Sequence, residues 1–266
     1  MKTKIVRSWR VAGAVLAATF MSSAFSAQAQ SLQVKTSSGA VEGKADGPVH
    51  AFLGIPYAAP PVGDLRWKAP MPPAKWDGVR KATDFGSHCM QGPVFGDMTF
   101  HDPGGSEDCL TLNVWLPAKP PSAKLPVMVW IYGGGFQIGA TSQSVYDGTA
   151  LAEQGVVLVS INYRVGVLGF LAHPELDKES PHGASGNYGL MDMVAGLEWV
   201  KRNISAFGGD PGNVTIFGQS GGGGKVMRLM HMPVAKGLFH RVIAESGGGL
   251  NYRTVDLDAA IKRQQA

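Results

Sequence analysis

The stretch VTIFGQSGGGGK occupies residues 214–225 and decides the fold prediction. Its first four residues are β-branched or aromatic and predict a short buried strand, whereas the glycines after Ser220 open a helix although each costs about 1 kcal/mol relative to alanine. A serine between glycines at such a junction is typical of a tight, strained turn, because larger neighbours would collide with the strand or the helix. The alternative is a turn that only lets a helix pack closely on a sheet.

A second glycine-rich loop occurs earlier in the chain. The segment VMVWIYGGGF, residues 127–136, begins as a continuous apolar run, as in a strand buried on both faces, and continues directly into three glycines. Glycines let backbone N–H groups approach a reacting carbonyl, and each such N–H can stabilise the developing negative charge by about 3 kcal/mol. A glycine triplet after one strand and G-x-S-x-G after a later one is the order that acyl transfer at a serine requires. The segment therefore predicts an oxyanion loop; a tight turn with aromatic packing is the alternative.

Other apolar runs predict how the strands are connected. Residues 156–161 and 242–244 predict further buried strands, and Leu190 to Asn203 shows helical spacing, with glycines at 208 and 209 as a stop. This alternation of strand and helix is typical of a doubly wound sheet, in which the carboxyl ends of the strands share one edge. We also expect an edge hairpin formed by residues 32–34 and 41–43, and irregular structure over residues 56–73.

Several further blocks match a known family. They are FLGIPY (52–57), GDLRW (63–67), SEDCLTLNV (106–114), NYR (162–164), GNYGL (186–190) and AFGGDP (206–211). With the serine turn they resemble the type-B carboxylesterases and lipases of the α/β-hydrolase fold, a family that also includes cholinesterases and non-catalytic neuroligin-like adhesion proteins. The resemblance implies an α/β-hydrolase with a mostly parallel, doubly wound sheet, truncated in its second half because family members are considerably longer.

The resemblance also assigns roles to individual residues. It implies that Ser220 is the nucleophile and that the N–H groups of Gly134, Gly135 and Gly221 form the oxyanion hole. Family members often have histidine where Tyr132 stands, and Glu-Ser-Ala where this chain has Gln-Ser-Gly at residues 219–221. Neither departure removes a backbone donor, so the assignment stands.

The N-terminus has the three parts of an export signal. Four basic residues within the first ten precede the apolar segment 11–20, which is too short to span a bilayer comfortably, and Ala27-Gln28-Ala29 supplies a small-x-small cleavage site. We therefore expect residues 1–29 to be a signal peptide cleaved near Ala29, and residues 30–266 to be the N-terminal part of a single domain. The protein is then secreted or periplasmic without a stable membrane anchor; an uncleaved anchor is the alternative.

Removal of that segment changes the net charge. The chain has 24 Lys and Arg against 20 Asp and Glu, and residues 1–29 contain four bases and no acids, which leaves 20 of each. Without net charge or a long basic stripe, the composition gives no reason to expect nucleic acid or an anionic membrane surface as partner. The expected partner is a small carboxylic ester.

The chain has two cysteines, Cys89 and Cys109. In an exported protein pairing is the default, and a bridge would close a loop of about 20 residues and add roughly 3 kcal/mol of stability. In the family the cysteine of the EDCL block is joined to one upstream, so the resemblance implies this disulfide; it also implies a structural ion pair between Arg66 and Glu107. Two isolated thiols argue against a metal site, and we expect neither a metal ion nor a cofactor.

A serine hydrolase also needs a base and an orienting carboxylate, which in α/β-hydrolases follow the serine in the order acid, then histidine. Only His231 and His240 follow Ser220. His231 is about 11 residues further on, roughly 16 Å along a helix, and His240 precedes a strand and so lies at the opposite edge of the sheet. We therefore expect the triad acid and histidine to be missing from this chain.

Two functions of different classes follow. The favoured one is a carboxylic ester hydrolase that acts through a serine nucleophile and an acyl-enzyme intermediate, of which this chain is the N-terminal portion and by itself inactive. The alternative is a non-catalytic, neuroligin-like binding or adhesion relative, or an inactive truncated product. The intact serine and glycines favour the hydrolase, because a binding protein has no need of them.

Overall fold

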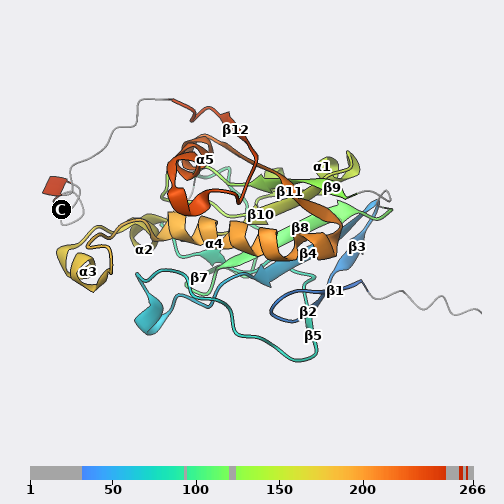
Figure 1. The fold of residues 1–266 in the computed structure, drawn as a ribbon, viewed down its shortest axis with the longest axis horizontal. Coiled ribbons are helices and arrows are strands. Elements are labelled where there is room, and N and C mark those ends of the chain that lie inside the picture. The colour runs from blue at the N-terminus through green and yellow to red at the C-terminus, as the bar shows by residue number, and fades with distance from the viewer. Residues whose placement is uncertain (1–31, 93–94, 120–123, 250–257, 260–261, 263–266) are drawn as a thin grey trace, which may run out of the picture. The chain divides into compact units, whose positions relative to one another are not determined.

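The computed structural model describes residues 32–92, 95–119, 124–249, 258–259 and 262. Strands form a central sheet and helices pack against it (Figure 1). The strands are β1 (Gln33–Lys35), β2 (Ala40–Glu42), β3 (Lys44–Asp46), β4 (Val49–Pro56), β5 (Val79–Lys81), β6 (His88–Cys89), β7 (Gly105–Ser106), β8 (Thr111–Pro117), β9 (Leu125–Trp130), β10 (Val157–Ile161), β11 (Gly209–Gln219) and β12 (Arg241–Glu245). The helices are α1 (Thr149–Glu153), α2 (Gly166–Phe170), α3 (Pro174–Glu179), α4 (Tyr188–Asn203) and α5 (Gly221–His231).

Seven of the described strands form one sheet in the order β12-β11-β9-β10-β8-β4-β3. The strands from β10 to β12 pair in parallel, whereas the pairs β10–β8, β8–β4 and β4–β3 are antiparallel. Parallel pairs arise where a helix carries the chain back to the starting edge, and antiparallel pairs where a turn reverses it, as between β3 and β4. The predicted α/β architecture is confirmed, but the described sheet is mixed, and only the half that bears both glycine-rich loops is parallel.

The strands predicted for the parallel half are all present. The runs 127–131, 156–161 and 242–244 correspond to β9, β10 and β12, and the predicted helix 190–203 corresponds to α4. β11 is longer than predicted, because it begins at Gly209 and passes an irregularity between Gly209 and Val214 before the apolar run. Backbone pairing with β9 extends the strand there without apolar side chains, which a hydrophobic pattern does not detect.

The parallel half of the sheet is covered on both faces. In β10 the odd-numbered residues 157–161 belong to the larger hydrophobic core together with Leu197 of α4, whereas Leu158 belongs to a smaller core together with Ala152 of α1. Because side chains alternate along a strand, α4 and α1 lie on opposite faces, and α4 crosses in front of the sheet in Figure 1. A sheet buried in this way holds the ends of β9 and β11 in fixed positions.

The N-terminal part follows the predictions where it is described. β1 and β2 form the expected antiparallel hairpin, to which β5 adds in parallel. Residues 57–73 are irregular apart from a single 3-10 turn at Gly63–Leu65. The expected signal peptide, residues 1–29, lies outside the described residues. Within the described ranges, no helix combines the length and the apolar character needed to cross a membrane.

Candidate active site

Ser220 lies at the junction between β11 and α5. Its backbone has a positive φ of 56° with ψ −124°, a conformation that side chains other than glycine rarely adopt, and it is the N-cap residue of α5. Its neighbours must be small, because a methyl group on Gly218 would lie 2.5 Å from the Ile131 carbonyl oxygen and one on Gly222 would lie 2.1 Å from the same oxygen. The predicted strand, turn and helix are confirmed, and the glycines are needed for the turn and its close packing rather than for the helix.

Backbone hydrogen bonds hold the turn on both sides. The Ser220 N–H donates to the Glu245 carbonyl oxygen of β12 at 2.8 Å, and the Gly224 N–H donates to the Ser220 carbonyl oxygen at 3.1 Å. The first bond attaches the turn to the neighbouring strand, and the second begins the helix. Ser220 itself is exposed among the described residues. The turn thus presents a serine at the edge of the sheet on a backbone that is fixed from two directions.

The glycine triplet that follows β9 lies against this turn. β9 and β11 are adjacent and parallel, with Trp130 opposite Phe217, so both loops leave the sheet at the same edge. A methyl group on Gly133 would lie 3.4 Å from the Ser220 Cβ, and one on Gly221 would lie 2.8 Å from the Gly135 amide nitrogen. The structure therefore brings together the two loops that the sequence pairs.

Three backbone N–H groups in these loops are available to a ligand. Gly134 and Gly135 have φ values of 83° and 59°, which favour glycine, and a methyl group on Gly134 would lie 2.0 Å from the Ile138 carbonyl oxygen. Among the described residues, the N–H groups of Gly134, Gly135 and Gly221 donate to no protein acceptor. For Gly221 this follows from its place at the start of α5, where an N–H has no partner within the helix. Unpaired donors of this kind can bind an anion.

Tyr132 packs inside the protein. It is fully buried, and its ring stacks on that of Tyr163 with 4.1 Å between the centroids. Each hydroxyl donates to the backbone carbonyl oxygen of the other tyrosine, at 3.0 Å from Tyr132 and 2.6 Å from Tyr163. Burial raises the pKa of both phenols, so both are neutral. This reciprocal pair joins the glycine loop to the segment that follows β10.

Lys225, the fifth residue of α5, is buried beneath the glycine loop and was not singled out from the sequence. Its side chain is fully buried, and its Nζ donates to the carbonyl oxygens of Gly133 at 3.2 Å and Tyr132 at 3.4 Å. Burial, reinforced by the positive charge of Arg228, lowers the pKa of Lys225 from 10.5 to about 7. The signal in the sequence was a lysine four residues after Gly221, hence on the same helix face as the turn.

Known proteins share this sequence and fold. The sequence profile of the Carboxylesterase family matches residues 30–266. The chain belongs to the carboxylesterase family. It is 52% identical over 213 residues to fumonisin B1 esterase of Sphingopyxis macrogoltabida and 50% identical over 216 residues to para-nitrobenzyl esterase of Bacillus subtilis (strain 168). A solved structure of a PNB esterase superposes with a TM-score of 0.80 at 46% sequence identity, which confirms the α/β-hydrolase fold.

The chain spans less than half the length of those relatives. Both sequence alignments cover 80% of the chain, but they cover 39% of fumonisin B1 esterase and 43% of para-nitrobenzyl esterase. The superposition covers 88% of the chain and 47% of the PNB esterase structure. The comparisons therefore bear on one part of the relatives' fold.

Neither histidine that follows Ser220 lies at the serine turn. His231 is the last residue of α5, and its Nδ1 is 2.8 Å from the Met227 carbonyl oxygen. His240 immediately precedes β12, and its Nδ1 accepts a hydrogen bond from the Val214 N–H at 3.1 Å. Val214 lies several residues before Ser220 on β11, so His240 is near the far edge of the sheet. In the part of the chain that the structure describes, no cluster of histidine, cysteine or acidic side chains is arranged to hold a metal ion.

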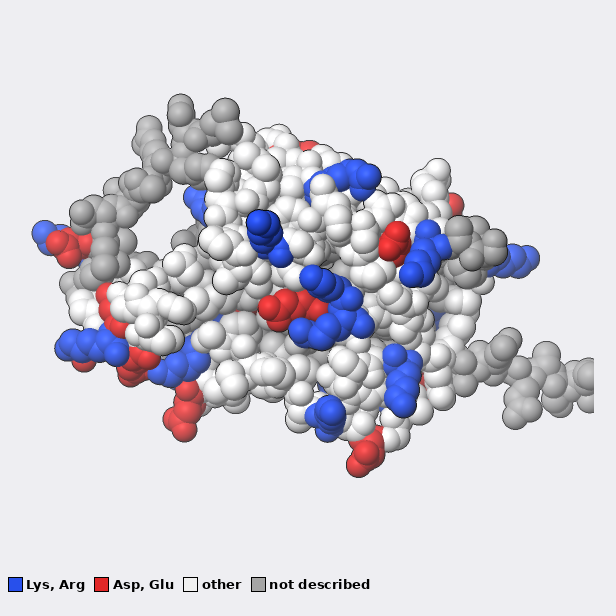
Figure 2. All heavy atoms as spheres, in the orientation of Figure 1, with Lys and Arg blue, Asp and Glu red and all other residues white. Residues whose placement is uncertain are grey.

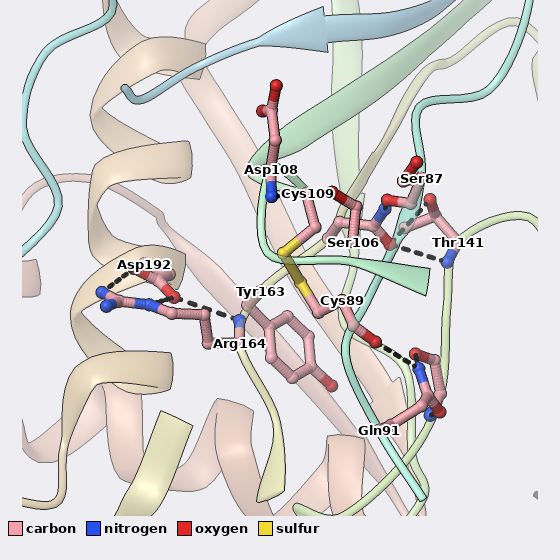
Figure 3. Close-up of a disulfide and its surroundings, with 12 residues drawn as sticks. Ser87, Cys89, Gln91, Ser106, Asp108, Cys109, Thr141, Tyr163, Arg164 and Asp192 are labelled. Atoms are coloured by element: carbon pink, nitrogen blue, oxygen red, sulfur yellow. Dashed lines mark hydrogen bonds and ion pairs between the residues drawn. A yellow bond between two sulfur atoms is a disulfide. The ribbon is translucent and has the colours of Figure 1, made fainter. Parts of the chain in front are cut away.

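The segment between Cys89 and Cys109 is tied down by covalent and ionic links. The two cysteines form the predicted disulfide, with 5.0 Å between their Cα atoms (Figure 3). Arg66 donates two hydrogen bonds to Glu107, at 2.6 and 2.7 Å, which confirms the expected ion pair. Figure 3 also shows the buried ion pair of Arg164 with Asp192 of α4. These links fix loops of the protein to its core.

Proposed function

We propose that the protein is a carboxylic ester hydrolase in which Ser220 is the nucleophile. The observation that carries the proposal is the contact between the strained serine turn and the glycine loop after β9, with a methyl position on Gly133 only 3.4 Å from the Ser220 Cβ. A serine with such a positive φ costs about 1–3 kcal/mol and persists only where the surrounding structure imposes it. Such strain, next to unpaired N–H donors, is useful for acyl transfer and has no evident value in a packing turn.

The reaction would proceed in two steps through an acyl-enzyme. The Ser220 hydroxyl loses its proton to a base and attacks the ester carbonyl carbon, and the negative charge that develops on the carbonyl oxygen is accepted by the N–H groups of Gly134, Gly135 and Gly221. Collapse of this intermediate expels the alcohol, which takes up the proton, and leaves an acyl group on the serine. Water then attacks the acyl group by the same route and releases the acid.

The base and its orienting carboxylate are proposed to lie outside this chain. His231 and His240 are bound at other places in the fold, by the Met227 carbonyl and the Val214 N–H respectively. A positioned base typically contributes 10²- to 10⁴-fold to such a step, so residues 1–266 alone should be inactive. The alternative, a non-catalytic, neuroligin-like relative or an inactive truncated product, also agrees with the positions of the two histidines. It does not explain why the backbone at Ser220 is strained.

The proposed substrate is a small carboxylic ester. Two of the relatives are named as esterases of fumonisin B1 and para-nitrobenzyl esters, which gives the reaction class but no acyl or alcohol preference for this chain. On the face shown in Figure 2, basic and acidic side chains are interspersed on a largely uncharged surface. This agrees with the balanced charge of residues 30–266 and supports neither nucleic acid nor an anionic membrane as partner. We further propose export to the periplasm or medium after cleavage near Ala29.

The first test removes the nucleophile from the full-length protein, meaning this chain together with any segment encoded downstream of Ala266. Ser220→Ala should lower kcat for hydrolysis of short-chain p-nitrophenyl esters by at least about 10⁴-fold. The free energy of unfolding should not fall, so a loss of activity would not reflect a loss of fold. A variant that retained substantial turnover would show that another residue attacks the ester.

A second test uses residues 30–266 alone. We expect no steady turnover above that of the matched Ser220→Ala protein, because the base is absent. We also expect the fragment to aggregate, since β12 is an edge strand with Ile243 43% exposed among the described residues. A soluble monomer with serine-dependent turnover would contradict the proposal that the base lies outside this chain.

A further inference from the structure

Lys225 is unusual for a residue in the core of a helix–sheet interface. Lysine is rarely buried without a carboxylate partner, and its desolvation costs more than burial of an apolar side chain of similar size. Among the described residues, no carboxylate lies within bonding distance of the Lys225 Nζ, which contacts two carbonyl oxygens and two aromatic faces. Stability alone would favour methionine or leucine here, so the amine calls for another explanation.

The two carbonyl oxygens that Lys225 binds belong to the glycine loop. The Gly133 carbonyl shares its peptide plane with the Gly134 N–H, and the Tyr132 carbonyl shares its plane with the Gly133 N–H. In a trans peptide the C=O and the N–H point in opposite directions, and the described chain has no cis peptide bond. A donor held on the Gly133 oxygen therefore fixes the direction of the Gly134 N–H on the other side of the plane. A hydrogen bond to the oxygen also strengthens the N–H as a donor.

The remaining contacts hold the amine in place. Its Nζ lies 4.5 Å from the ring centroid of Phe136 and 5.1 Å from that of Tyr163. A methyl group on Gly221 would lie 3.4 Å from the Nζ, so the amine sits directly beneath the first turn of α5. Tyr163 also donates to the Tyr132 carbonyl oxygen, at 2.6 Å, so that oxygen receives hydrogen bonds from two elements.

We propose that Lys225 is a positioning residue of the hydrolase, which orients and polarises the Gly133–Gly134 peptide so that the Gly134 N–H faces the substrate oxyanion. The proposal rests on the function proposed above. Lys225 touches neither the nucleophile nor the ester in this scheme, and it acts through the peptide that it binds. The amine keeps two N–H donors when it is neutral, so the contact persists in both protonation states, but the cation polarises the peptide more strongly.

The groups that face the amine explain how it responds to pH. Tyr132 and Tyr163 are neutral phenols, Phe136 contributes a ring face, and Arg228, one turn further along α5, also lies over the Phe136 ring at 4.9 Å. Arg228 donates to the Gly224 carbonyl oxygen at 2.9 Å. Its charge lowers the pKa of Lys225, which makes Arg228→Met a matched control that removes a neighbouring cation and keeps the contact under study.

The experiment observes the Gly134 amide by NMR in the full-length protein, with glycine labelled at 15N and the carbonyl 13C to select Gly-Gly pairs. In the wild type the chemical shift of the Gly134 amide should change with pH as Lys225 loses its proton, with a midpoint near pH 7. In Arg228→Met this midpoint should move upwards. In Lys225→Met the titration should vanish. In parallel, Lys225→Met should lower kcat by about 10- to 100-fold with KM within about twofold, whereas Arg228→Met should keep kcat within about twofold.

The outcomes separate the inference from the proposed function. A Gly134 resonance that does not respond to Lys225→Met would overturn the inference, and so would an unchanged kcat per site titrated with a fluorophosphonate. If Lys225→Met does not fold, the test is the pH titration of the Gly134 amide in Arg228→Met. A midpoint that does not move upwards in that variant would count against the role of Lys225. If the wild type does not hydrolyse esters, or Ser220→Ala still does, the proposed function fails, and the Gly134 titration alone decides whether Lys225 controls that peptide.

Discussion

At the scale of single residues, Ser220 and Lys225 differ in how far sequence predicts them. The strained backbone of Ser220 was predictable because its causes, a β-rich run and flanking glycines, lie within a few neighbouring residues. The contacts of Lys225 join positions 92 and 93 residues apart, and no local pattern reports such a contact. That Tyr163 is the packing partner of Tyr132 was not predicted for the same reason, since their loops meet only when β9 and β10 are paired.

Burial of Lys225 makes the stability of the protein depend on pH. Its pKa is about 7 in the folded protein and about 10.5 when unfolded, so between these values the unfolded state binds more protons. The free energy of unfolding should therefore rise with pH above 7, by up to about 1.4 kcal/mol per pH unit from this group. Below pH 7 the contribution of Lys225 to the free energy of unfolding no longer changes with pH. Urea unfolding of the full-length protein between pH 7 and 9 measures the slope. Lys225→Met should remove this contribution, and an identical slope in the two proteins would contradict the assigned pKa.

At the scale of elements, the glycines that open α5 are not equivalent. A methyl group on Gly222 would lie 2.1 Å from the Ile131 carbonyl oxygen, whereas on Gly224 its nearest neighbour is the mobile end of Arg228 at 3.3 Å. Gly222→Ala should therefore destabilise the protein by several kcal/mol, about the scale of severe overpacking. Gly224→Ala should be neutral or stabilise by up to about 1 kcal/mol through helix propensity. Thermal unfolding of both variants tests the pair, and equal losses would show that the helix rather than the close packing requires the glycines.

The sheet shows which elements a sequence pattern can predict. β9, β10 and β12 were predicted because strands buried in a sheet carry continuous apolar runs. The first half of β11 was not, because its residues 209–213 are held by backbone pairing and a register irregularity rather than by apolar side chains. The antiparallel half of the sheet was missed because the strand directions there depend on turns and loops that the alternation of strand and helix does not describe.

At the scale of the whole molecule, the disulfide stabilises a segment with little regular structure. Between Cys89 and Cys109 the described β pairing consists of β6 with β7 and an isolated bridge from Phe100 to Gln143. Closing a loop of about 20 residues should contribute roughly 3 kcal/mol, so the double replacement by alanine should lower the unfolding free energy by about that amount. Denaturant unfolding of the full-length protein, with the reduced wild type as control, measures the loss. Alkylation of both thiols in non-reduced, exported protein would show that the bridge does not form.

The hydrogen bond from the Ser220 N–H to the Glu245 carbonyl oxygen has a consequence for the order of biosynthesis. Glu245 leaves the ribosome about 25 residues after Ser220, which corresponds to about 1–5 s of translation. Until then the turn lacks its hydrogen bond to β12, which is one of the contacts that impose the strained backbone at Ser220. The reactive serine is therefore among the last features of these residues to reach its working geometry on the nascent chain.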